Sequence, residues 1–164
     1  MAAGPMGPVV GELAKLPAAD IRAMAVYLVS LDASAVSRPQ PDDALIAKPT
    51  LASLSRGKRI FEGACQGCHA DGKGPKLFGV SPALARNSNL HSQQPDNLLK
   101  IILHGIATPA TQDLGYMPGF KDSFSDTQLS DLTAYLRNRF APNQPQWRGV
   151  REKVAQLRAN PGMH

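Results

Sequence analysis

The sequence predicts an all-α fold, and three observations support this prediction. Apolar residues recur three and four positions apart, the spacing of one helix face, in residues 16–28, 51–61, 95–104 and 124–136. Helix start and stop signals are also present: Ser125 and Gln128 have the spacing of a capping box, and Gly105 suits a C-terminal cap. The 14 glycines and 14 prolines predict long irregular segments between the helices.

A motif of five residues, Cys65-Gln66-Gly67-Cys68-His69, follows the second of these segments. This spacing is typical of covalent haem attachment, in which each thiol forms a thioether with a haem vinyl group and the imidazole binds one face of the iron. The chain has two cysteines in total, which excludes a Cys₄ zinc site and a larger disulfide framework. Thioredoxin-type pairs need a strand–helix context that the sequence lacks. We therefore expect one covalent haem c on Cys65 and Cys68, with His69 as an axial iron ligand.

The composition fits a protein built around such a group. Hydrophobic residues make up 43% of the chain but aromatic residues only 5%, so a haem would supply the large apolar body that the side chains lack. The 18 Lys and Arg residues only modestly exceed the 13 Asp and Glu residues, and no dense basic run is present. This balance argues against nucleic-acid binding.

The sequence shows neither a membrane span nor a secretion signal. No window approaches 18 consecutive apolar residues, and residues 1–11 lack a positively charged region followed by an apolar stretch. Because haem c is normally attached outside the cytoplasm, we expect a periplasmic protein, or one on the outer face of the cytoplasmic membrane through its partners. Either a signal has been removed or the chain is one piece of a longer exported polypeptide.

The N-terminal segment resembles a later part of the same chain. Residues 16–28 align without gaps on residues 124–136, with apolar residues at five shared places: Leu16 and Phe124, Ile21 and Leu129, Met24 and Leu132, Tyr27 and Tyr135, Leu28 and Leu136. A methionine beside Pro or Gly precedes each helix, Met6 in one case and Met117 in the other. One interpretation is that amphipathic helices look alike and that this segment covers part of a single domain. We favour the other, in which residues 1–31 are the closing helix of a truncated preceding haem domain and Met6 is its axial ligand.

The next segment, residues 32–50, contains prolines among alanines and serines, a composition typical of an extended linker. We expect the haem domain over residues 51–141. Its first helix should lead into the cysteine motif, because helical spacing joins Leu51, Leu54, Lys58 and Phe61. Gly57 lies one turn before the last of these and would let the helix that carries Leu132 and Tyr135 cross closely.

A further helix is predicted from Pro95 to His104. Pro95 fits the first turn, Asp96 favours the positive end of the helix dipole, and Gly105 fits the C-terminal cap. The side of this helix that should face the core carries Leu98, Leu99, Ile102 and Leu103.

The second axial ligand is expected to be Met117. Gly115 and Pro118 flank it and favour a loop, which can present a thioether over a flat ring. A methionine ligand is soft and neutral, favours ferrous iron and raises the reduction potential. The alternatives are that Met117 only fills the core, the commoner role of methionine, or that the iron has two histidine ligands.

The remaining histidines are weaker candidates for iron ligands. His104 lies late in an apolar helix, which favours a packed or capping role. His91, in a polar loop, and His164, at the terminus, are expected to be solvated. Met24 occupies the apolar face of its helix and is expected to be a core residue.

Residues 142–164 are expected to form a tail with a short amphipathic helix. Its apolar stripe consists of Trp147, Val150, Val154 and Leu157, and the rest of its surface is basic. The tail either docks onto a partner subunit or folds back on its own domain.

With these residues placed, the chain resembles class I c-type cytochromes over residues 51–140. The resemblance consists of the thioether motif, a first helix with Gly and an aromatic residue, a methionine loop and a closing helix with Tyr135-Leu136. Pro82-Ala83-Leu84 is similar to the family's Pro-x-Leu segment, in which the Pro carbonyl accepts a hydrogen bond from the axial histidine. Arg86 stands where the family usually has Gly, and is a candidate partner for a haem propionate.

More specifically, the chain looks like the C-terminal haem domain of a multi-haem cytochrome c subunit of a periplasmic dehydrogenase. Such subunits accept electrons from alcohol or aldehyde dehydrogenases and from molybdenum hydroxylases of the nicotinate and isoquinoline type. The tail from Trp147 to Leu157 is more similar to the hydroxylase group. The resemblance implies dehydrogenase subunits and other electron carriers as partners.

These residues predict a one-electron carrier rather than an enzyme. With His69 and Met117 on its two faces, the iron has no open position for a substrate, and no acid–base pair or nucleophilic constellation stands out. Electrons would pass through the ring edge near Cys65 and Cys68. The alternatives are a five-coordinate haem enzyme or gas sensor, which needs an open axial position, and a chain that no longer receives haem.

Overall fold

The computed structural model describes residues 6–32, 49–69, 83–107 and 116–159. Within these ranges the regular secondary structure is helical, apart from an isolated antiparallel bridge between Ile106 and Met117. The helices, in chain order, are α1 (Met6–Leu13), α2 (Ala18–Asp32), α3 (Leu51–Ala64), α4 (Gln66–His69), the 3₁₀ turn η2 (Leu84–Arg86), α5 (Ser88–His91), α6 (Asp96–His104), α7 (Asp126–Phe140) and α8 (Val150–Ala159). The predicted all-α class is confirmed.

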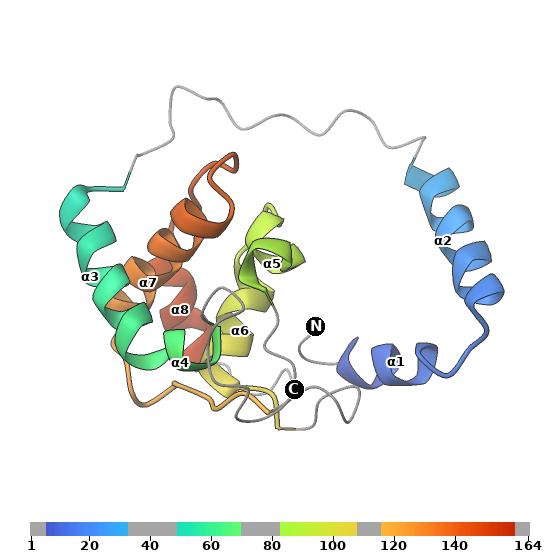
Figure 1. Cartoon of the computed structure of the whole chain (residues 1–164), viewed down its shortest axis with the longest axis horizontal. Coiled ribbons are helices and arrows are strands. Elements are labelled where there is room, and N and C mark those ends of the chain that lie inside the picture. Colours follow the sequence, from blue (N-terminus) through green and yellow to red (C-terminus); the bar gives the residue numbers. More distant parts are fainter. Residues whose placement is uncertain (1–5, 33–48, 70–82, 108–115, 160–164) are drawn as a thin grey trace.

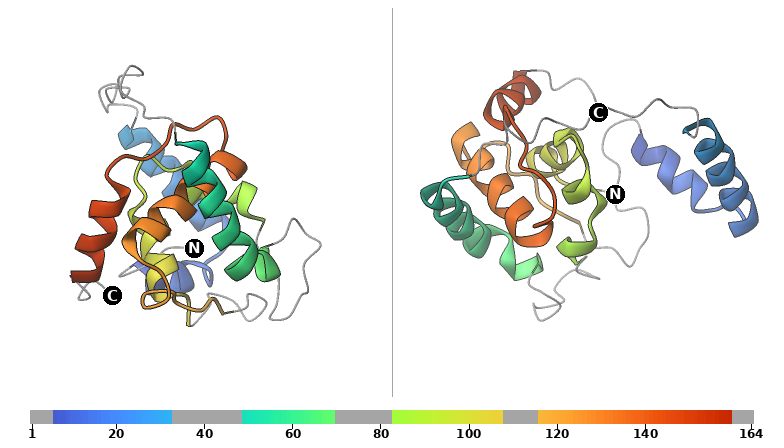
Figure 2. Two further views of the ribbon diagram at one scale, coloured as in Figure 1. Left: turned by 90° about the vertical axis from the view of Figure 1, so that its left-hand side faces the viewer. Right: turned by 90° about the horizontal axis from the view of Figure 1, so that it is seen from above.

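Helices α3 and α7 cross each other (Figures 1 and 2). Gly57 lies at the crossing, as the sequence predicts. A Cβ atom at Gly57 would lie 2.1 Å from the carbonyl oxygen of Asp131 and 2.7 Å from the Cβ of Tyr135, so glycine is what lets the two backbones approach this closely. One turn later Phe61 is buried, and its ring centroid lies 5.6 Å from those of Tyr135 and Phe140. This spacing is typical of attractive aromatic pairs.

The start of α3 is held by polar contacts that sequence reasoning did not predict. Thr50 caps the helix, because its Oγ1 accepts a hydrogen bond from the N–H of Ser53 at 3.1 Å. Ser53 Oγ and Arg56 Nε donate to the buried carboxylate of Asp131 on α7, at 2.5 and 2.6 Å. Burial alone would raise the pKa of Asp131, but the hydrogen bonds from Arg56 and Ser53 and the Arg56 charge outweigh it and hold this pKa below its ordinary value.

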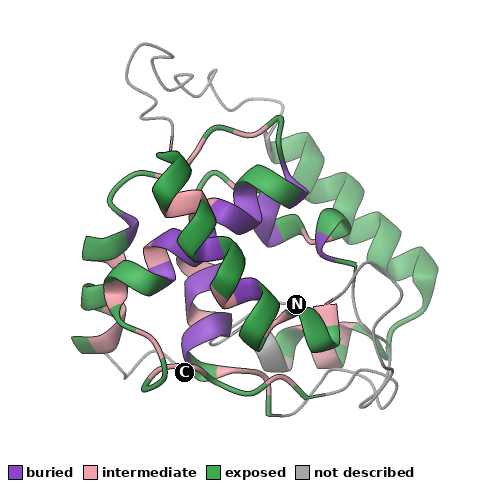
Figure 3. Cartoon of the chain, turned by 60° about the vertical axis from the view of Figure 1, so that its left-hand side comes forward, coloured by how far each residue is buried: buried purple, intermediate pink, exposed green. Residues whose placement is uncertain are grey.

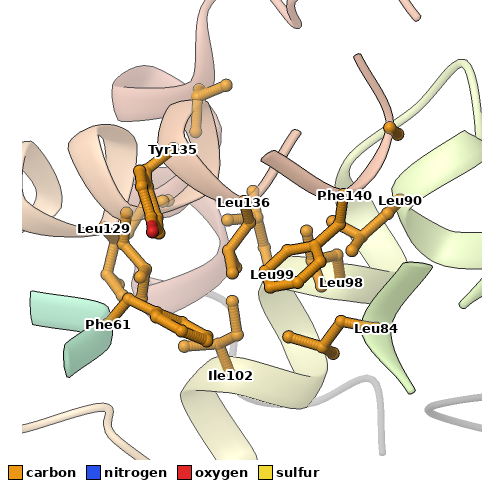
Figure 4. Close-up of a cluster of buried hydrophobic side chains, with 14 of the residues drawn as sticks. Phe61, Leu84, Leu90, Leu98, Leu99, Ile102, Leu129, Tyr135, Leu136 and Phe140 are labelled. Atoms are coloured by element: carbon orange, nitrogen blue, oxygen red, sulfur yellow. The ribbon is translucent and has the colours of Figure 1, made fainter. Parts of the chain in front are cut away.

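The core lies where α3, α6 and α7 meet. Figure 4 shows buried side chains from these helices pointing toward one another. The four residues predicted for the core face of α6 are all buried: Leu98, Leu99, Ile102 and Leu103. Gly105 ends α6 with a φ of +72°, as its expected capping role requires. The capping box of α7 is also present, since the N–H of Gln128 donates to Ser125 Oγ and the N–H of Ser125 donates to Gln128 Oε1.

The tail helix α8 folds back on its own domain and packs against α7. Val150 is buried and Val154 is 0% exposed, so the apolar stripe predicted for the tail faces the core. Trp147, just before the helix, lies against the guanidinium of Arg137, whose central carbon is 4.0 Å from the ring centroid.

Arg137 joins three parts of the chain, although it is only 1% exposed. Its guanidinium donates to the main-chain carbonyls of Leu90 and Ser92, both at 2.7 Å, and of Pro145 at 2.9 Å. Burial lowers the pKa of Arg137, and the three carbonyl dipoles partly offset the cost of placing its charge in the interior. The tail and the connection between α5 and α6 are therefore tied to α7 by one side chain.

Helices α1 and α2 lie apart from the other helices (Figures 1 and 2). Figure 3 shows α2 as almost entirely exposed, and its apolar side chains include Tyr27 and Leu28, each 62% exposed. Met24, expected in a core, is 39% exposed. The main chain at Met6 begins α1 and is helical, whereas Met117 lies in an extended bridge, so the two methionine segments differ in conformation.

In the part of the chain that the structure describes, no helix combines the length and the apolar character that crossing a bilayer requires.

Candidate cofactor site

An apolar cavity opens between α3, α6 and α7, and it holds the candidate ligands. Its volume is about 220 Å³, well above the single-water voids that close-packed interiors normally leave. It is lined by Cys65, His69, Leu84, Asn87, Leu98, Ile101, Ile102, Ile106, Met117, Phe120, Leu132 and Leu136. A thiol, an imidazole and a thioether therefore share one cavity, although the first two are far from Met117 in the sequence.

The cysteine side of the cavity is a continuous helical turn. The N–H of Cys65 donates to the carbonyl of Phe61 at 2.9 Å, and the N–H groups of Cys68 and His69 donate to the carbonyl of Cys65 at 3.1 and 2.9 Å. Cys65 and His69, one turn apart, both line the cavity, whereas Cys68 is exposed and lies outside the lining. The crossing of α3 with α7 fixes where this turn lies.

The two thiols differ in environment. Cys65 is partly buried and packs against the core, whereas Cys68 is exposed. Burial, and to a smaller extent the charge of Cys68, raises the pKa of the Cys65 thiol to about 11. At neutral pH Cys65 is therefore a neutral group that suits an apolar wall.

The methionine side of the cavity is held by main-chain atoms. Ile106 and Met117 exchange two N–H···O bonds, at 2.8 and 3.0 Å, which hold the main chain at Met117 against the residue pair that follows α6. A Cβ atom at Gly105 would lie 2.3 Å from the carbonyl oxygen of Met117, and one at Gly119 would lie 2.8 Å from the carbonyl oxygen of Leu103. Two glycines thus let the methionine segment lie directly on the end of α6.

The other histidines lie outside the cavity lining. His104 is exposed at the end of α6. His91 is exposed at the end of the short helix α5, where its Nε2 lies 3.0 Å from the carbonyl oxygen of Ala85. His164 lies outside the described residues, as does Pro82 of the Pro-x-Leu segment, while Leu84 of that segment lines the cavity. Beside His69, the described part of the cavity lining therefore offers Met117, rather than a second histidine, as a candidate ligand.

The donor set and the lining both fit a haem. Two thiols can form thioethers, an imidazole and a thioether can bind iron from opposite faces, and the remaining walls are almost wholly aliphatic or aromatic. Ligand sites of this kind combine a mainly apolar lining with a few placed polar groups.

Of the twelve lining residues that the structure describes, Cys65, His69 and Met117 were predicted as site residues; Asn87, Ile106 and Phe120 are three of those that were not. Asn87 caps α5, because its Oδ1 accepts a hydrogen bond from the N–H of Asn89 at 3.0 Å, and it also borders the cavity. Ile106 follows Gly105 and Phe120 follows Gly119, and both side chains line the cavity. For these two residues the available signal in the sequence was the position after a glycine, which alone does not show what the side chains face.

Comparisons with known proteins agree with this geometry. The family model described as cytochrome C oxidase, cbb3-type, subunit III matches residues 52–136. Over its whole length the chain is 62% identical to a nicotinate dehydrogenase subunit of Pseudomonas putida. It is 31% identical to the fructose dehydrogenase cytochrome subunit of Gluconobacter japonicus, over 87% of its length, and 31% identical to cytochrome c6 of Synechocystis sp., over 52% of its length. The chain spans 14%, 34% and 64% of these three relatives, in the same order.

Proposed function

This chain belongs to the cytochrome c family described as cytochrome C oxidase, cbb3-type, subunit III, and is an electron-transfer domain; we propose that it carries one covalent haem c. In this proposal Cys65 and Cys68 form the thioethers, and His69 and Met117 are the axial iron ligands. The observation that carries the proposal is the cavity that Cys65, His69 and Met117 line together. When bound, the haem supplies an iron that accepts and releases one electron.

The chain's own residues would keep that site rigid. The turn that holds Cys65, Cys68 and His69 continues from α3 by main-chain hydrogen bonds, and the Met117 segment is bonded to the end of α6. Because both ligand-bearing segments are anchored to packed helices, little has to move when the charge of the site changes. The apolar lining excludes water, and together with a thioether ligand it favours the reduced state.

The position of Met117 also bears on the alternative functions. A five-coordinate haem enzyme or gas sensor needs one open axial position, whereas here a thioether shares the cavity with His69. This favours a carrier over an enzyme that acts on a substrate at the iron.

We further propose that the electrons come from a dehydrogenase subunit or a neighbouring haem and leave to another carrier. Two of the relatives are named as a dehydrogenase subunit and as a dehydrogenase cytochrome subunit. The tail from Trp147 to Leu157 resembles that of the nicotinate and isoquinoline hydroxylase group, which favours a donor subunit of this type. Such a complex would act in the periplasm or on the outer face of the cytoplasmic membrane, where haem c is attached.

Residues 1–31 are proposed to close a preceding haem domain. The α2 residues that align with buried α7 residues are themselves exposed to solvent. Met24 is 39% exposed, whereas its α7 counterpart Leu132 is 1% exposed. Leu28 is 62% exposed, and its counterpart Leu136 is 5% exposed. A face with the apolar pattern of α7 but without a covering helix is expected if the covering helix belongs to another segment. An in-frame Cys-x-x-Cys-His coding stretch directly upstream in the DNA would support this proposal, and a non-coding upstream region would refute it.

The haem proposal is tested by exporting the full chain in a host that matures c-type cytochromes. The product should stain for haem after denaturing electrophoresis, because a covalent haem survives unfolding. Met117→Leu should abolish the red-end absorption band of methionine-bound ferric iron and allow the reduced protein to bind carbon monoxide. Met24→Leu is the matched control and should change neither property. A colourless product, or a Met117→Leu protein with the wild-type spectrum, would refute the proposal.

A further inference from the structure

The turn between Met117 and α7 forms one wall of the cavity. The N–H groups of Phe120 and Lys121 donate to two carbonyls in the last turn of α6, at 2.9 and 3.0 Å. Phe120 lines the cavity beside Met117, and its ring stacks on that of Phe124 with centroids 5.4 Å apart. An outward shift of this turn would therefore move the segment that carries the thioether.

Arg158 of α8 holds the same turn from the outer side. Its Nε donates to the carboxylate of Asp126 at 2.6 Å, and its two terminal nitrogens donate to the main-chain carbonyls of Lys121 and Phe124. Lys121 and Phe124 belong to the turn, and Asp126 is the first residue of α7. One guanidinium therefore binds the turn at two points and also binds the helix that follows it. The side chain of Arg158 is only 23% exposed, so water competes for these acceptors less than it would on an open surface.

Helix α8 is anchored independently of Arg158. Val150 and Val154 are buried against the core, and Lys153 pairs with Asp96 in the first turn of α6 at 3.1 Å. The helix therefore bridges the start of α6 and the start of α7, the two helices that the Met117 segment connects. Arg158 extends from a fixed support toward a segment that otherwise depends on main-chain bonds and glycine contacts.

We propose that Arg158 is a positioning residue that keeps Met117 in its iron-binding place. It acts through the turn that lies between Met117 and α7 and does not touch the ligand. The inference rests on the proposed function, because it requires that Met117 binds the iron. For the thioether to leave, its segment has to move away from His69, and the three charge-assisted bonds of Arg158 oppose that movement of the adjoining turn.

The test is a titration of the ferric, haem-loaded full chain with imidazole, which competes with the thioether for iron. Arg158→Gln should raise the apparent imidazole affinity about fivefold to tenfold, the lower range of couplings between linked sites. Arg151→Gln is the matched control, because Arg151 is exposed on the same helix and the charge change is identical. Arg158→Lys should lie between wild type and Arg158→Gln, since lysine keeps the charge but has no planar fork of donors.

A second readout is amide hydrogen exchange at Phe120 and Lys121. Exchange at both should be faster in Arg158→Gln than in Arg151→Gln, because the turn opens more often. Equal imidazole affinities and equal exchange rates in the two variants would overturn the inference while leaving the methionine ligand in place. If Arg158→Gln does not fold, the comparison of Arg158→Lys with Arg151→Lys decides in the same way. A wild-type protein without a methionine–iron band would instead refute the proposed function.

Discussion

Replacing Gly57 with alanine would test the helix crossing that positions the cysteine turn. At an unobstructed helix position this change is stabilising by roughly 0.5–1 kcal/mol, because alanine loses less chain entropy on folding. At Gly57 the new Cβ would lie 2.1 Å from the carbonyl oxygen of Asp131 and 2.7 Å from the Cβ of Tyr135. Neither atom is the end of a flexible side chain. The two helices would have to separate by about 1 Å to restore ordinary contact distances.

The size of the effect follows from these opposing contributions. Overpacking typically costs about 1–3 kcal/mol and sometimes more. Here the separation also loosens the packing of Phe61 and the hydrogen bonds to Asp131 across the same crossing. With about 3 kcal/mol for overpacking, roughly 1 kcal/mol for the loosened contacts and the helix-propensity gain of roughly 1 kcal/mol subtracted, we expect a net loss of roughly 3 kcal/mol of unfolding free energy. For a domain of this size, that loss lowers Tm by roughly 12–24 °C.

The assay is thermal unfolding followed by circular dichroism, with Gly63→Ala as the matched control. Gly63 lies on the same helix, and a Cβ there would meet no described atom within 4 Å. This control should be as stable as the wild type or slightly more stable. Equal Tm values for Gly57→Ala and Gly63→Ala would refute the close crossing and the reasoning built on it.

Three other contacts lead to measurable outcomes. The pKa of Asp131 is lowered in the folded chain. Its stabilising contribution is therefore present above the ordinary value of 3.8 and is lost as the pH falls through the lower pKa of the folded state. Asp131→Asn should weaken the loss of stability to urea below this pH, and a loss equal to that of the wild type would contradict the prediction. Arg137→Gln removes the donor from the carbonyls of Leu90 and Pro145 and one of two donors from that of Ser92. It should cost roughly 2–3 kcal/mol in urea unfolding, whereas the exposed Arg148→Gln should stay within about 0.5 kcal/mol. Similar losses in the two variants would argue against the role of Arg137 in joining these segments. Gly105→Ala would place a Cβ 2.3 Å from the carbonyl oxygen of Met117 and should alter the ferric absorption spectrum, which a wild-type spectrum would disprove.

Signals that depend on neighbouring residues predicted much of the helical frame. The capping box of Ser125 and Gln128 and the cap at Gly105 were predicted and are present. A glycine followed one turn later by an aromatic residue predicted a close helix crossing at Gly57. The structure confirms it, since Gly57 lies directly against Tyr135.

Contacts between distant segments were not predictable in the same way. Asp131 and Arg137 occupy α7 positions that a sequence pattern assigns to solvent, yet both are buried. Their partners come from α3, from the end of α5 and from the segments that follow α5 and α7, which only the tertiary fold brings together. Conversely Leu51, placed on the apolar face of α3 by its spacing, is 87% exposed because no described segment covers the start of that helix.

The candidate site shows the same division. The cysteine motif and the glycine–proline loop pointed to Cys65, His69 and Met117, and the structure brings these residues to one cavity. That they bind haem remains a prediction. The wall residues Asn87 and Phe120 were not foreseen, since what they face depends on how α6 and the methionine segment are placed relative to each other.

The way the methionine segment is fastened has a consequence for how recognition could diverge. Main-chain hydrogen bonds between Ile106 and Met117 and the close approach of Gly105 and Gly119 hold Met117 on the end of α6. None of these contacts uses the side chain of the preceding Tyr116, which has 56% of its surface open to solvent. If Met117 binds the iron as we propose, a substitution at Tyr116 would change the surface next to the ligand and keep the main-chain contacts that hold it. Selection could then act on partner affinity and on iron chemistry separately.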